Sequence, residues 1–288
     1  MPYAESGAGK LYYEETGEGE PIIFCHEFAA DYRTWEPQVR YFSRHYRCIT
    51  YNSLGYSPSD VPDDDAAYGY EQQRDNIRAL MDHLGIEKAH LVGLSMGSYS
   101  ALQFALAYPD RVTAVAFSSG GSASLPLDRK PDPTESLKRG HGLLEVGWDA
   151  AIEFASLGPT RVQLQNKDAR GWAQFREYLL EHPAKGSGKT MLNFQAQRPT
   201  LYGREADLRK LKTPVLLMVG DEDDGVIEVN IFLKRTIPRA GMWMAPRTGH
   251  AMNLEEPAMY NQMLAEFFSA VERGGWGPRD PRATPHPA

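Results

Sequence analysis

The residues best placed to do chemistry form the pentapeptide Gly93-Leu94-Ser95-Met96-Gly97. An apolar run at 89–92 precedes it and predicts a buried strand, and an Ala- and Leu-rich run at 98–107 follows it and predicts a helix. A Gly-x-Ser-x-Gly turn between a strand and a helix is a nucleophile elbow, a strained turn that exposes the serine hydroxyl. We therefore expect Ser95 to act as a nucleophile and the backbone N–H of Met96 to stabilise a developing oxyanion.

A serine hydroxyl is a poor nucleophile at neutral pH and needs a positioned base. Of the eight histidines, His250 is the best candidate, because it lies between the last predicted strand, 241–245, and the last predicted helix, 255–273. His26 also follows a predicted strand. Its neighbours suit a loop that binds an oxyanion, so we interpret its ring as structural.

The histidine in turn needs a carboxylate that fixes its tautomer and stabilises the imidazolium. We expect this acid directly after the strand predicted at 215–220, where the chain offers Asp221, Glu222, Asp223 and Asp224. The segment Ser118-Ser119-Gly120, after an earlier predicted strand, offers no carboxylate. Position alone leaves the four acidic residues open.

Strands and helices alternate along the first part of the chain, which predicts a mostly parallel sheet with right-handed crossovers. The predicted strands are 10–14, 22–25, 47–51, 89–92 and 112–117, and the predicted helices are 34–42, 70–84 and 98–107. The alternation then stops. Nearly a hundred residues separate Ser118 from the strand at 215–220, which is far more than a normal connection needs.

This long insertion contains helical patterns at 135–144, 148–157, 168–181 and 205–211, and loop signals at 125–133 and 183–188. We expect a helical cap over the catalytic end of the sheet, the alternative being a separate helical domain. Its aromatic residues Trp148, Phe154 and Trp172 predict an apolar substrate pocket. The alternative is that these rings only pack the cap helices together.

These residues resemble the α/β-hydrolase superfamily over about 10–273, in its capped esterase, enol-lactonase and C–C hydrolase branch. The order Ser95, Asp223, His250 matches the family order. The resemblance selects Asp223, because the family acid stands three residues after a glycine, here Gly220. It also implies an oxyanion hole formed by the N–H groups of Phe28 and Met96.

The expected fold is therefore an α/β-hydrolase fold, a mostly parallel central sheet flanked by helices, with a helical cap inserted after the sixth strand. We expect the hydrolase core at 1–120 and 206–274 and the cap at 121–205. The segment 275–288 is rich in Pro, Gly and charged residues and predicts a disordered tail.

The chain departs from the family at Glu27, where relatives usually have glycine after the histidine. Glu27 must therefore adopt a backbone conformation open to side chains. A carboxylate aimed at the oxyanion hole would oppose the negative charge of the transition state. Glu27 either turns away from the site, or it reaches the pocket and selects substrates that carry a hydrogen-bond donor or a cation.

A serine at the elbow implies an acyl-enzyme, which favours a small carboxylic ester or lactone as substrate. Relatives that dehalogenate or open epoxides use an aspartate there. One alternative is a C–C hydrolase of aromatic ring-cleavage products, for which Arg161, Arg170 or Arg198 could bind a substrate carboxylate. Another is a small-molecule receptor with slow or no turnover.

Composition sets further expectations. A net charge of -7 and a pI near 5.7, with no basic stripe, argue against a nucleic-acid partner. No apolar run approaches the length of a membrane span, and the N-terminus shows no signal sequence. We expect a cytoplasmic monomer or homodimer that acts on a small molecule without a metal or cofactor.

Overall fold

The computed structural model describes residues 2–129 and 132–283, in which the strands form an eight-stranded sheet of order β1-β2-β4-β3-β5-β6-β7-β8. β1 pairs with β2, and β2 with β4, in antiparallel fashion, and the remaining neighbours are parallel. The strands are β1 (Tyr3–Glu5), β2 (Lys10–Thr16), β3 (Glu20–Cys25), β4 (Tyr46–Tyr51), β5 (Ala89–Leu94), β6 (Val112–Ser118), β7 (Val215–Gly220) and β8 (Ala240–Ala245). The predicted mostly parallel sheet is confirmed.

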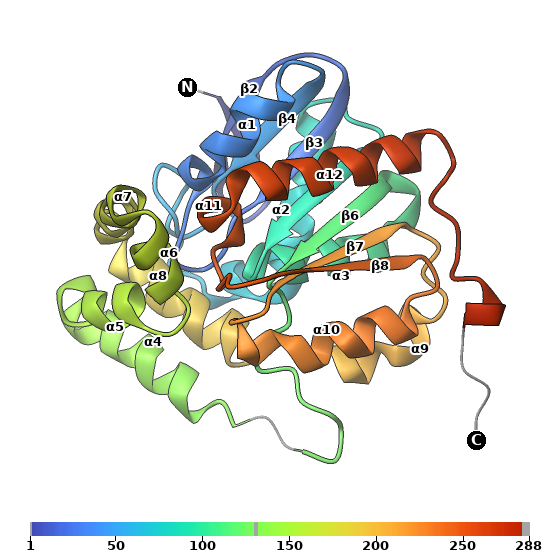
Figure 1. Cartoon of the computed structure of the whole chain (residues 1–288). Coiled ribbons are helices and arrows are strands. Elements are labelled where there is room, and N and C mark those ends of the chain that lie inside the picture. The colour runs from blue at the N-terminus through green and yellow to red at the C-terminus, as the bar shows by residue number, and fades with distance from the viewer. Residues whose placement is uncertain (1, 130–131, 284–288) are drawn as a thin grey trace.

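Helices cover both faces of the sheet (Figure 1), as the continuous apolar strands require. On one face Ile22 and Phe24 of β3 pack with residues of α1 (Glu36–Phe42) and α12 (Pro257–Glu272). On the other face Ile23 packs in a cluster that includes α2 (Tyr70–His83), α3 (Met96–Ala107) and α10 (Asp224–Thr236). Among the described residues, no helix has both the length and the apolar character needed to cross a membrane.

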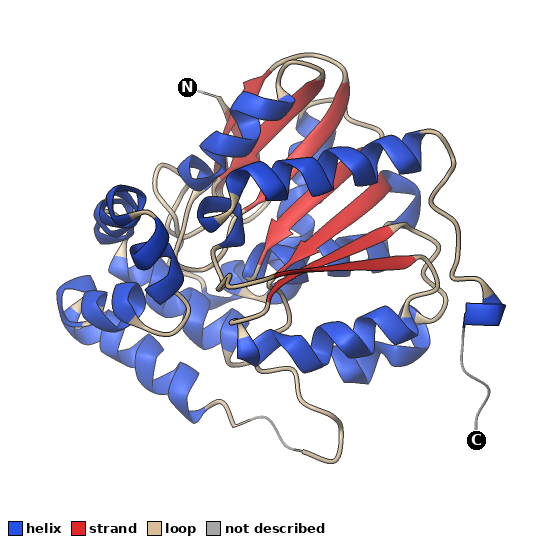
Figure 2. Cartoon of the chain, in the orientation of Figure 1, coloured by secondary structure: helices blue, strands red, loops and turns tan. Residues whose placement is uncertain are grey.

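A mainly helical segment, for which we keep the expected bounds 121–205, follows the sixth strand, and its helices at 134–190 gather at one end of the sheet (Figure 2). We call it the cap segment. Its core contains Trp148 and Phe175, which pack in one cluster with Ala29 after β3 and Ala251 after β8. The cap segment therefore packs on the edge where the parallel strands end. Its main helices are α4 (Thr134–Val146), α5 (Ile152–Leu157), α6 (Val162–Lys167), α7 (Ala169–Leu180) and α8 (Ala184–Thr190), followed by α9 (Glu205–Leu208).

The loop predicted at 183–188 is wrong, because this segment forms α8. Its glycines suggested a loop, but they serve close packing instead. A Cβ built on Gly186 would lie 1.9 Å from the carbonyl oxygen of Gly55 in the core. Glycine lets this helix touch the core backbone, and tertiary packing outweighs its weak helix propensity.

The prediction of a disordered tail from residue 275 is also wrong for its first residues. The ring of Trp276 packs against Phe267 of α12, with centroids 4.6 Å apart. The indole N–H of Trp276 donates to the carbonyl oxygen of Arg239 at 2.8 Å. Nε of Arg239 in turn donates to the carbonyl oxygen of Trp276 at 2.9 Å. A half-buried aromatic anchor outweighs the polar composition around it. Residues 284–288 lie outside the described residues.

The elbow gives a direct test of backbone packing. A Cβ at Gly97 would lie 2.0 Å from the carbonyl oxygen of Cys25, whereas a Cβ at Gly142 in α4 would meet open space. We expect Gly97→Ala to lower the free energy of unfolding by about 3 kcal/mol, and Gly142→Ala to leave it unchanged or raise it. Urea unfolding measures both, and equal midpoints for the two variants would contradict this account.

Candidate active site

Ser95 occupies the sharp turn between β5 and α3. Its backbone has φ 52° and ψ −109°, a strained conformation for a residue with a side chain. Its N–H donates to the carbonyl oxygen of Ser118 at 2.8 Å, which fixes the turn to the end of β6. Ser95 is partly exposed, while Leu94 and Met96 on either side are buried. The turn therefore presents the hydroxyl at the carboxyl edge of the sheet.

His250 and Asp223 meet at the same edge, in the loops after β8 and β7. Nδ1 of His250 lies 2.7 Å from Oδ2 of Asp223, and both residues are buried. Because a carboxylate can only accept, Nδ1 carries the proton and Nε2 is left free to accept one. The other predicted acids are placed differently: Asp221 accepts from the N–H of Thr248, Glu222 pairs with Gln163, and Asp224 is exposed at the start of α10.

Glu255 holds the loop that carries His250, a role for which no candidate was named from the sequence. Its two carboxylate oxygens accept the N–H groups of Gly249, at 2.6 Å, and Ala251, at 3.1 Å. These donors flank His250 on both sides. The glutamate shortly after Gly-His is the signal that points to this contact.

His26 fixes the loop after β3. The N–H of Ser53 donates to its Nε2 at 3.0 Å, so Nδ1 carries the proton and donates to the carbonyl oxygen of Glu27 at 2.7 Å. Burial lowers the pKa of His26 to about 4, which keeps the ring neutral. A neutral ring with both nitrogens occupied positions the backbone and is not available as a base.

The two predicted oxyanion donors lie on adjoining segments. Met96 is the first residue of α3, so its N–H precedes the first intrahelical hydrogen bond. The close approach of Gly97 to the carbonyls of Cys25 and His26 brings the loop after β3 against this helix start. The carbonyl of Phe28 accepts the hydroxyl of Tyr56 at 2.9 Å, which anchors that loop.

Glu27 reaches into the site. Its backbone is not among the described non-glycine residues with positive φ, so a side chain fits without strain. The carboxylate is 3% exposed, and its Oε2 lies 2.5 Å from Nη2 of Arg161 in the cap segment and 3.8 Å from Nε2 of His250. Burial of the ring lowers the pKa of His250. The carboxylates of Asp223 and Glu27 raise it by more than burial lowers it, so the net shift of the pKa is upward.

The aromatic residues predicted to bind substrate differ in position. Trp148 is buried and its ring lies 6.2 Å from that of Phe28, next to the predicted oxyanion hole. The indole of Trp172 donates to the carbonyl oxygen of Ser156 at 2.7 Å, a contact internal to the cap segment. The side chain of Phe154 lies outside the described residues.

The three cap arginines are occupied or remote. Arg161 pairs with Glu27, and its guanidinium lies over the ring of Phe175. Arg198 donates to the carbonyl and hydroxyl oxygens of Ser122, and burial lowers its pKa to about 10. Arg170 is exposed. Arg161 is thus paired with a carboxylate, whereas Arg198 is held by uncharged oxygen atoms.

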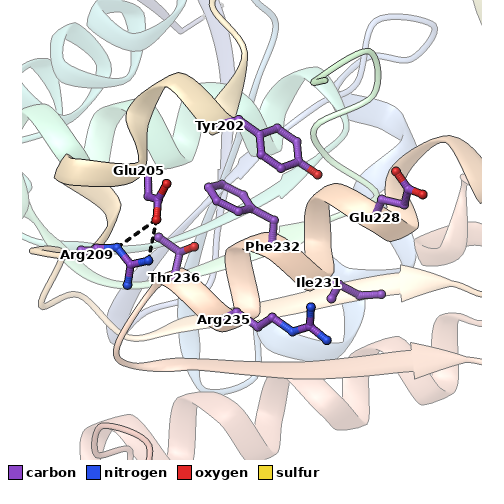
Figure 3. Close-up of a pocket in the computed structure, with 8 residues that line it drawn as sticks. All are labelled: Tyr202, Glu205, Arg209, Glu228, Ile231, Phe232, Arg235 and Thr236. Atoms are coloured by element: carbon purple, nitrogen blue, oxygen red, sulfur yellow. Dashed lines mark hydrogen bonds and ion pairs between the residues drawn. The ribbon is translucent and has the colours of Figure 1, made fainter. Parts of the chain in front are cut away.

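A hollow of about 530 Å³ lies between the segment at 202–209 and the later turns of α10 (Figure 3). The rings of Tyr202 and Phe232 stack there at 4.2 Å, and Arg209 pairs with Glu205. None of the predicted site residues lines this hollow, so it is separate from the Ser95 edge.

The sheet, the strained serine turn and the His250–Asp223 pair are features of a known class of enzymes. The family model described as alpha/beta hydrolase fold matches residues 20–257. The chain belongs to this family.

Its relatives span several reactions. A 2-hydroxy-6-oxononadienedioate/2-hydroxy-6-oxononatrienedioate hydrolase of Paraburkholderia phymatum is 30% identical and covers 90% of this chain and 91% of its own. The crystal structure of an enol-lactonase from Burkholderia xenovorans superposes with a TM-score of 0.82 at 22% identity, over 93% of this chain and all of the other. A thermophilic esterase from Thermogutta terrifontis superposes with a TM-score of 0.81 at 27% identity, over 91% of this chain and 94% of the esterase chain.

The charges around His250 set a pH dependence. A base must be neutral to accept a proton, and the pKa of His250 is raised, so we expect kcat/KM to fall as the pH drops through a midpoint above about 6.5. Glu27→Gln removes a negative charge near His250 and leaves the positive charge of Arg161 without its partner. Both effects favour the neutral form of the His250 ring. The midpoint should move to lower pH.

A pH–rate profile of kcat/KM measures this shift. Glu228→Gln makes the same chemical change at an exposed residue beside the separate hollow and should leave the midpoint in place. A midpoint that stays the same or rises in Glu27→Gln would contradict the assigned electrostatics.

Proposed function

We propose that this protein is a serine hydrolase that cleaves a small carboxylic ester or lactone through an acyl-enzyme, with Ser95, His250 and Asp223 as its triad. The observation that carries the proposal is the geometry at the sheet edge. A strained serine turn lies at the same edge as a buried imidazole whose Nδ1 is held 2.7 Å from a carboxylate. This combination activates a serine for attack on a carbonyl carbon.

In the first half of the reaction, Nε2 of His250 takes the hydroxyl proton while Ser95 Oγ attacks the carbonyl carbon. The N–H groups of Phe28 and Met96 stabilise the oxyanion, and Asp223 stabilises the imidazolium. Collapse of the tetrahedral intermediate breaks the bond to the leaving oxygen, which receives its proton from His250.

In the second half, a water molecule takes the place of the alcohol. His250 accepts a proton from it as its oxygen attacks the acyl carbon, and then returns the proton to Ser95 Oγ as the acid leaves. A lactone follows the same steps, except that its alcohol remains attached to the acyl group. The cap segment, 121–205, covers this edge and sets which acyl groups enter.

The pairing of Arg161 with Glu27 favours an uncharged acyl group. Binding a second carboxylate in a buried site needs an unpaired cation, because desolvation of a charge is costly. Arg161, the arginine that acts on His250, is already neutralised by Glu27. An ester or lactone without further charge therefore suits the site better than a dicarboxylate.

The second candidate is hydrolysis of a C–C bond in a ring-cleavage product. It is favoured by the 30% identity to the dienedioate hydrolase of Paraburkholderia phymatum over 90% of this chain. In this case the leaving group is a carbanion equivalent, which needs protonation before or during cleavage. Arg161 would have to exchange Glu27 for the substrate carboxylate.

The two candidates separate in one assay. We expect p-nitrophenyl esters of short-chain acids to be hydrolysed over many turnovers, and Ser95→Ala to lower kcat at least roughly a thousandfold with the fold intact by circular dichroism. Leu94 precedes the serine in the same turn, and Leu94→Val is a matched control that keeps the hydroxyl.

Activity that survives in Ser95→Ala would refute the proposed nucleophile. Cleavage of a vinylogous 1,5-diketone acid with no ester turnover would replace the ester proposal by C–C hydrolysis. A single burst that stalls with every substrate would indicate a receptor.

A further inference from the structure

The Glu27 carboxylate is an unusual group to find beside the predicted catalytic base. Its two oxygens have different surroundings. Oε2 is bound by Arg161, but Oε1 is buried and has no hydrogen-bond partner among the described residues. A buried carboxylate oxygen without a donor is costly, and Oε1 is therefore open to a donor that a bound molecule brings.

The positive charge on Arg161 limits which chemical groups can bind Oε1 of Glu27. The guanidinium neutralises Glu27 at 2.5 Å, and both side chains are 3% exposed. A cationic group of the substrate at Oε1 would be repelled by Arg161. It would also lose its hydration, and no unpaired negative charge would compensate that loss. A neutral donor, such as a hydroxyl, instead gains a charge-assisted hydrogen bond.

The position of Glu27 shows where the donor must lie. Oε2 is 3.8 Å from Nε2 of His250, the atom that exchanges protons with the serine and the leaving group in the proposed reaction. A donor that reaches Oε1 is therefore close to the reacting ester. A hydroxyl on a carbon one or two bonds from the ester group, on either the acyl or the alcohol side, meets this requirement.

We infer that Glu27 is a specificity-determining residue whose free Oε1 accepts a hydrogen bond from a neutral hydroxyl next to the scissile ester, so that the substrates are hydroxy esters or hydroxy lactones. The inference deepens the proposed function and rests on it. Arg161 is the positioning residue that holds the carboxylate in place.

Glu27→Gln tests the acceptor without changing its shape. Arg161 can only donate, so it orients the new amide oxygen toward itself and turns the amide NH₂ to the position of Oε1. The variant thus replaces an acceptor by a donor at the same point. A hydroxyl group can donate or accept, whereas a methoxy group can only accept.

The experiment compares matched esters by kcat/KM on the pH plateau of each protein. One pair places the group on the acyl side, the methyl esters of β-hydroxybutyrate and β-methoxybutyrate. The other places it on the alcohol side, hydroxyethyl butyrate and methoxyethyl butyrate. In at least one pair we expect the wild-type protein to prefer hydroxyl over methoxy roughly tenfold or more, and Glu27→Gln to bring this ratio near one.

Two controls keep the result interpretable. If Glu27→Gln does not fold, the double variant Glu27→Leu with Arg161→Met removes the whole ion pair, and it should abolish the same preference. Calorimetric binding of the four esters to Ser95→Ala measures the ratio without chemistry. It tests Glu27 even if no ester is turned over, in which case the proposed function fails by itself.

The inference is overturned if the wild-type protein shows no preference for hydroxyl in either pair. It is also overturned if the ratio is the same in the wild-type protein and in the Glu27 variants.

Discussion

The contact between the first turn of α3 and the loop after β3 is the constraint on which the site depends. A Cβ at Gly97 would lie within 3 Å of the carbonyls of Cys25 and His26, so only glycine permits this approach. The contact holds Ser95 at φ 52° and brings the segments that carry Met96 and Phe28 together. The strain at Ser95 is thus maintained by backbone packing, and the two N–H groups of the proposed oxyanion hole lie on the segments that this contact joins.

Charge balance is the second determinant of the site. With His250 neutral, Asp223 and Glu27 contribute two negative charges and Arg161 one positive charge; protonation of His250 brings the sum to zero. Removing one partner of a buried pair such as Glu27–Arg161 typically costs 3–5 kcal/mol, about as much as many surface substitutions combined. The pair also joins the cap segment to the core at 2.5 Å, so the cap segment takes part in the electrostatics around His250.

Much of this could be predicted from the sequence because the decisive signals are local. The elbow and the strands around Ser95 follow from a short pattern, and His250 from its place after a strand. Position left four acidic residues open, and the family resemblance selected Asp223 among them. The contact between Glu27 and Arg161 could not be predicted, because 134 residues separate them and only the folded cap brings them together. α8 and Trp276 were missed for a related reason: Gly186 and the Trp276 ring are determined by long-range packing that local composition does not contain.

The proposed reaction requires that Ser95 carries the acyl group during turnover. Rapid-quench mass spectrometry of the wild-type protein mixed with p-nitrophenyl butyrate tests it most directly, because a good leaving group favours accumulation of the acyl-enzyme. We expect a butyryl adduct on the peptide that contains Ser95, formed at the rate of the p-nitrophenolate burst. Multiple turnovers with no adduct, or with the adduct on another residue, would contradict it.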